Sequence, residues 1–108
     1  MIQDSLTPDL VLIDDDELIQ AAWKMTAREK GHRLICFRNV EEFKKSSISK
    51  RTPIYIDFHI SDNVTGLDVA EKLHQLGFEK LHITTGSFTS HVLNSPLIKS
   101  IVAKDYPL

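Results

Sequence analysis

The stretch Pro53-Ile54-Tyr55-Ile56-Asp57 decides how the rest of this chain is interpreted. It is a short β-branched and aromatic run that ends in a carboxylate, and a polar loop, residues 58–65, follows it. An unpaired charge in an apolar interior costs several kcal/mol, so we expect Asp57 where a buried strand leaves the core. In open α/β sheets, ligands bind at this carboxyl edge of the strands. The stretch therefore predicts a strand that presents a functional carboxylate.

Four more runs have the length and composition of strands: Leu10–Ile13, Leu34–Phe37, Leu81–Thr84 and Ile98–Val102. A continuous apolar run of this length is typical of a strand that is buried on both faces. Parallel neighbours need crossover connections, and helices supply them. The sequence therefore predicts a doubly wound α/β domain with a five-stranded parallel sheet between two helical layers.

The segments between these runs carry helix signals. Apolar side chains recur at three- and four-residue spacings over residues 18–29, with Asp16 as the expected cap and Gly31 as the expected end. Asn39 is placed to cap a short second helix, and residues 67–76 form the face of a third. Residues 90–93 favour at most one helical turn, so we expect the fourth helix to be shortened.

Composition narrows the class of protein. The chain has 108 residues, 42% of them hydrophobic and 26% charged, which fits one globular domain with its core over about residues 9–104. A formal net charge of -2 gives no basic face for nucleic acid, and no apolar run is long enough to cross a membrane. With no secretory signal and a single Cys36, expected to be a buried filler, a cytoplasmic setting is predicted.

Reactive side chains gather at the predicted strand ends. Asp14 and Asp15 follow the first strand, Asp57 ends the third, Thr85 follows the fourth and Lys104 follows the fifth. In the sheet order 2-1-3-4-5, which is taken from known folds rather than derived, strands one and three are neighbours, so the three carboxylates converge. Thr85 is preferred to its neighbour in the strand because it precedes a glycine. Lys104 is preferred to a lysine at the strand start because it lies at the correct edge.

Three carboxylates this close repel one another, and a hard divalent cation relieves the repulsion. Mg²⁺ prefers oxygen ligands and often uses one or two carboxylates together with a phosphate oxygen. Lys104 and Thr85 would add a positive charge and a hydrogen-bond donor for a phosphoryl group. Phosphoryl transfer needs little more than positioning and charge neutralisation, so Asp57 is the expected nucleophile.

Over residues 10–104, the chain resembles the receiver domains of two-component signalling. The resemblance implies that Asp14 and Asp15 bind Mg²⁺ and that Asp57 is the phosphoacceptor, with its carboxylate also a metal ligand. It implies one more metal ligand, the backbone carbonyl of His59. The donor would be a sensor histidine kinase or a phosphotransfer domain, and slow autodephosphorylation would be the only activity besides self-phosphorylation.

The chain also departs from the usual receiver pattern. Gly66 stands nine residues after the phosphoacceptor, where receivers have a glycine after eight. Asp105 replaces the proline that usually follows the lysine, and Ile101 replaces the switch aromatic. No sequence for a final helix follows Lys104. Such a shortened helical layer is similar to the receivers at the C-terminal end of hybrid sensor kinases.

Two other functions stay open from the residues. The departures favour a pseudo-receiver that binds a protein partner without phosphorylation. Alternatively, the run Asp14-Asp15-Asp16 mimics the Asp-x-Asp motif of phosphohydrolases, in which case Asp14 and not Asp57 is the nucleophile. Dinucleotide binding is disfavoured because the turn after the first strand contains no glycine.

Overall fold

The computed structural model describes residues 7–61, 64–86 and 96–108. Five strands form one parallel sheet in the order β2-β1-β3-β6-β7. In chain order they are β1 (Leu10–Ile13), β2 (Leu34–Phe37), β3 (Ile54–Asp57), β6 (Leu81–Thr84) and β7 (Ile98–Val102). This is a flavodoxin-like α/β arrangement, and it confirms the predicted sheet and its order.

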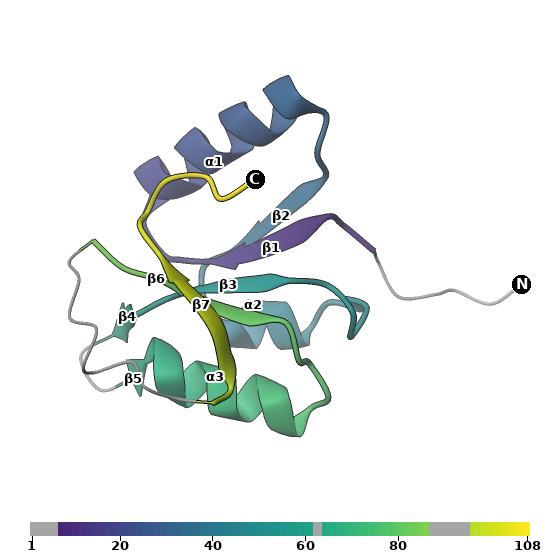
Figure 1. Cartoon of the computed structure of the whole chain (residues 1–108), viewed down its shortest axis with the longest axis vertical. Helices are drawn as coiled ribbons and strands as arrows, with labels where there is room; N and C mark the ends of the chain where they lie inside the picture. Colours follow the sequence, from purple (N-terminus) through teal and green to yellow (C-terminus); the bar gives the residue numbers. More distant parts are fainter. Residues whose placement is uncertain (1–6, 62–63, 87–95) are drawn as a thin grey trace, which may run out of the picture.

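In the described ranges, three helices cover the sheet: α1 (Glu17–Lys30), α2 (Val40–Lys44) and α3 (Gly66–Gln75). Helix α1 lies on one face of the sheet, and α2 and α3 lie on the other (Figure 1). The larger core joins α2 and α3 to the sheet, and the smaller one packs Trp23 of α1 against Leu10, Leu12 and Tyr55. Both faces of the central strands are therefore buried, which explains their continuous apolar runs.

The predicted helix caps are confirmed. The side chain of Asp16 accepts hydrogen bonds from the N–H groups of Leu18 and Ile19, and Gly31 ends α1 in the left-handed region with φ 75°. Asn39 accepts a hydrogen bond from the N–H of Glu42 over 2.9 Å. These residues fix both ends of α1 and the start of α2.

The region between β3 and α3 differs from the prediction. Residues 58–65 were expected to form a polar loop, but they contain two short antiparallel strands, β4 (His59–Ser61) and β5 (Val64–Thr65). The next helix starts one residue before the predicted face, with Thr65 as its cap in a reciprocal capping box with Asp68. The chain therefore leaves β3 through a hydrogen-bonded hairpin that holds the backbone beside Asp57.

The predicted shortened fourth helix falls on residues 87–95, outside the described residues. After β7, residues 103–108 form no helix. This segment runs along α1 instead (Figure 1), and the ring of Tyr106 packs edge-on against that of Trp23. The segment that carries Lys104 is therefore packed against the first helix.

Candidate functional site

The three predicted carboxylates meet at the carboxyl ends of β1 and β3, which are neighbouring strands. One oxygen from each of Asp14, Asp15 and Asp57 lies within 4.8 Å of the others. Asp14 is fully buried and Asp57 is 5% exposed, whereas Asp15 is open to solvent. Among the residues that the structure describes, this is the one group of three or more acidic, histidine or cysteine side chains that can hold a metal ion.

Asp14 is held from three sides. Its N–H donates to the carbonyl of Phe37, and its own carbonyl accepts from the Gln20 amide over 2.6 Å. One carboxylate oxygen, Oδ1, accepts the N–H of Asp16 at 2.9 Å. Sequence reasoning missed the role of Gln20, because a polar residue in an amphipathic helix carries no signal of a contact with the preceding strand.

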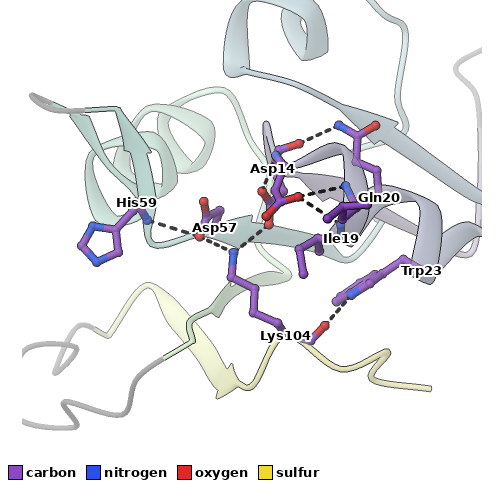
Figure 2. Close-up of polar contacts among 9 residues, drawn as sticks. Asp14, Ile19, Gln20, Trp23, Asp57, His59 and Lys104 are labelled. Carbon is purple, nitrogen blue, oxygen red and sulfur yellow. Dashed lines mark hydrogen bonds and ion pairs between the residues drawn. The ribbon is translucent and has the colours of Figure 1, made fainter.

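Lys104 enters this group from the segment after β7. Its Nζ lies 2.7 Å from Asp14 Oδ2 and 2.6 Å from Asp57 Oδ1, so one ammonium joins two carboxylates (Figure 2). Lys99, the competing candidate, is an exposed residue of β7. The choice of Lys104 from its position after the strand agrees with this geometry.

Burial and the neighbouring charges shift the pKa values of two side chains in the group. Burial raises the pKa of Asp57 and the charge of Asp14 adds to it, and together they outweigh the hydrogen bonds from Lys104 and His59. Burial alone would lower the pKa of Lys104, but its hydrogen bonds to Asp14 and Asp57 raise it above the ordinary value. Lys104 is therefore a firmly protonated counter-ion, and Asp57 is a carboxylate that is costly to ionise.

The backbone around Asp57 is closely packed. The N–H of His59 donates to Asp57 Oδ1 over 3.3 Å, and the N–H of Phe58 donates to the carbonyl of Thr84. A Cβ at Gly66 would lie 2.6 Å from the carbonyl oxygen of Asp57, closer than real Cβ atoms come. Gly66 is therefore required by the close approach of α3 to the end of β3.

Thr85 lies directly after β6, the neighbour of β3, and is buried. Its N–H donates to the carbonyl of Val102 at 3.0 Å, which fixes it at the same edge of the sheet as Asp57. The assignment of its hydroxyl to a phosphoryl group stays a prediction, as does the assignment of the His59 carbonyl to a metal. Ile101 of β7, at the position of the usual switch aromatic, is half-buried and packs against the larger core.

Comparison of the chain with known protein families, curated proteins and solved structures gives no match in any of the three. In the described part of the chain, no helix combines the length and the apolar character needed to cross a membrane. The site must therefore be interpreted from its own chemistry. Three carboxylates and one ammonium leave two negative charges, and the group offers oxygen ligands that suit a hard divalent cation.

Proposed function

We propose that this domain accepts a phosphoryl group on Asp57 and signals through the resulting change of charge. The observation that carries the proposal is the double ion pair of Lys104 with Asp14 and Asp57 beside exposed Asp15. An ammonium held between two carboxylates at the carboxyl edge of a parallel sheet is a rigid, positively charged position for a phosphoryl oxygen. The resemblance to receiver domains supports the same assignment.

The hydrogen bonds indicate which oxygen reacts. Both described hydrogen bonds to the Asp57 carboxylate, from Lys104 and from His59, end on Oδ1. Oδ2 is therefore the oxygen that they leave to attack. Its electron pair forms the bond to phosphorus as the bond from phosphorus to the donor's imidazole nitrogen breaks. That nitrogen keeps the bonding pair, and because the other ring nitrogen of the donor carries a proton, the products are an aspartyl phosphate and a neutral histidine.

The same residues suit Mg²⁺. When bound, Mg²⁺ would neutralise charge on the phosphoryl oxygens. The carboxylates of Asp14, Asp15 and Asp57 would hold it, with the His59 carbonyl as a further ligand implied by the resemblance. Because Lys104 already neutralises one of the three carboxylate charges, a divalent cation leaves the group neutral overall.

The proposed donor is the phosphohistidine of a sensor histidine kinase or of a phosphotransfer domain, in the cytoplasm. The proposed output is a change in binding to another protein, because an aspartyl phosphate adds charge and acceptor oxygens beside Thr85 and Lys104. The domain would be a signalling component and not an enzyme that turns over a metabolite.

Intact mass spectrometry after incubation with acetyl phosphate tests the proposal. We expect one phosphoryl adduct that requires Mg²⁺, that hydroxylamine removes, and that Asp57→Asn abolishes. Asp16→Asn is the matched control. It removes a neighbouring acidic charge while keeping a side chain that caps α1 equally well, so it should leave the adduct unchanged. An adduct that persists in Asp57→Asn, or that resists hydroxylamine, would refute the assignment.

The pseudo-receiver is the second candidate, and one observation favours it. The ammonium of Lys104 already pairs with both buried carboxylates, so each of these two has a counter-ion without any ligand. If this candidate is correct, no adduct forms with any phosphodonor or kinase, and partner binding is unchanged by Asp57→Asn. The phosphohydrolase is disfavoured because the side chain of Asp14 is fully buried, whereas that of Asp57 reaches solvent.

A further inference from the structure

The backbone of residues 103–108 is held in place by side chains. No hydrogen bond joins its main chain to another main-chain group within the described ranges. Instead, the indole Nε1–H of Trp23 donates to the Lys104 carbonyl over 2.7 Å, and Lys30 Nζ donates to the Leu108 carbonyl. The Tyr106 ring stacks on His32, with its hydroxyl 2.8 Å from His32 Nδ1. Helix α1 supplies two of these anchors, Trp23 and Lys30, and His32, which follows its Gly31 cap, supplies the third.

The anchor at residue 104 differs from the others in its rigidity. Trp23 is 1% exposed, and its ring is fixed edge-on between Tyr55 at 5.7 Å and Tyr106 at 5.5 Å. A buried indole N–H without a partner is unfavourable, so the hydrogen bond to the Lys104 carbonyl is strongly favoured in energy. Lys30, by contrast, is an exposed lysine with many rotamers.

Lys104 is thus held at both ends (Figure 2): Trp23 binds its main chain, and Asp14 and Asp57 bind its ammonium. A lysine side chain is flexible, and the position of its backbone decides which carboxylates its Nζ can reach. Asp105, and not a proline, directly follows Lys104, so no proline ring restricts the backbone at the next position. The hydrogen bond from Trp23 is a restraint on this backbone that comes from another element.

We propose that Trp23 is a positioning residue for the reaction at Asp57, acting through the main chain of Lys104. This inference rests on the proposed phosphoacceptor function. Loss of the indole N–H leaves the three carboxylates in place, because none of them contacts Trp23 through a hydrogen bond in the described structure. It loosens only the ammonium that meets the incoming phosphoryl group.

The sharpest variant replaces Trp23 with 3-benzothienylalanine, which keeps the bicyclic shape and lacks the N–H. We expect adduct formation from acetyl phosphate at saturating Mg²⁺ to slow about three- to tenfold, the kinetic equivalent of one ordinary hydrogen bond. The Mg²⁺ dissociation constant, measured by calorimetry, should stay within about twofold, because the metal ligands do not move. A defect in folding would lower both the rate of adduct formation and the affinity for Mg²⁺. A lower rate with an unchanged affinity therefore identifies a positioning role.

Tyr106→Phe is the matched control. It removes a hydrogen bond from the same segment, that to His32, and leaves the bond between Trp23 and the Lys104 carbonyl intact. Its adduct formation should match wild type. Equal rates for the benzothienyl variant and wild type, or an equal slowing in Tyr106→Phe, would overturn the inference.

A second readout separates this inference from the proposed function. The Cε–Hε nuclear magnetic resonance signal of Lys104 should stand apart from those of the exposed lysines in wild type and move toward them in the benzothienyl variant. If wild type forms no adduct, the proposed function fails while this signal still decides whether Trp23 fixes Lys104. An unchanged Lys104 signal would then overturn the positioning role.

Discussion

Replacing Lys104 with methionine removes the counter-ion of Asp14 and Asp57 while keeping most of the side-chain volume. Removing one member of a buried ion pair costs about 3–5 kcal/mol, because the partner charge is left uncompensated. Here Asp14 is fully buried, but the Lys104 side chain is 24% exposed, so water partly replaces it. We therefore expect Lys104→Met to lower the free energy of unfolding by about 2–3 kcal/mol at neutral pH without metal.

The loss should depend on pH in one direction. In the folded protein, the pKa of Asp57 lies above its ordinary value of 3.8, so the folded state binds this proton more tightly than the unfolded state. The contribution of this raised pKa to stability is thus fully present below 3.8 and is lost as the pH rises through the folded value. Removing the ammonium raises this pKa further. The difference between wild type and Lys104→Met should therefore be largest at neutral pH and shrink in acid.

Urea unfolding in EDTA, followed by circular dichroism, measures this difference. The midpoint should fall by about 1–2 M urea, and Mg²⁺ should restore part of it by replacing the missing positive charge. Lys99→Met is the control, because this exposed lysine of β7 makes no ion pair in the described structure. A variant as stable as wild type in EDTA, or a loss independent of pH, would refute the electrostatic account.

Three other predictions concern the surroundings of the site. Gly66→Ala should destabilise the fold by about 1–3 kcal/mol in urea unfolding, since its Cβ meets the backbone of Asp57, whereas Gly86→Ala meets nothing within 4 Å and should be tolerated. Burial raises the pKa of Cys36 from 9.0 to about 11, so at pH 8 iodoacetamide should alkylate the folded protein about 100-fold more slowly than the unfolded chain; equal rates would contradict this. Thr84 has a buried hydroxyl without a hydrogen-bond partner in the described structure, so Thr84→Val should raise the free energy of unfolding by about 1 kcal/mol, and a loss would show that the hydroxyl has a partner.

The sheet was predictable because its physics is local. A strand that is buried on both faces must be apolar throughout, so a charged residue can follow the strand only where the chain leaves the core. The positions of Asp14, Asp57 and Lys104 after apolar runs therefore predict that they lie at the edge of the sheet. The same reasoning separated Lys104, which follows β7, from Lys99, which lies near the start of that strand. The order of the strands came from known folds and not from these residues.

Other features could not be predicted, because their causes are distant in sequence. The hydrogen bond between Trp23 and the Lys104 carbonyl spans 81 positions, and an apolar helix residue gives no sign of its partner. The pairing of β4 with β5 follows an apolar–polar alternation over residues 58–61, and four residues is the shortest run that marks a strand, so the stretch was interpreted as a polar loop. The contact of Gly66 with Asp57 depends on how α3 packs below β3, which only the assembled fold defines.

The pairing of Lys104 with Asp14 joins residues 90 positions apart, and this has a consequence for synthesis on the ribosome. The chain emerges from its N-terminus, so both buried carboxylates are made long before the ammonium that compensates them. During that interval, β1 and β3 can pair only with two mutually repelling acids at one edge. The carboxylates gain this ion pair only after residue 104 has emerged, so the lysine stabilises the assembled sheet late in synthesis.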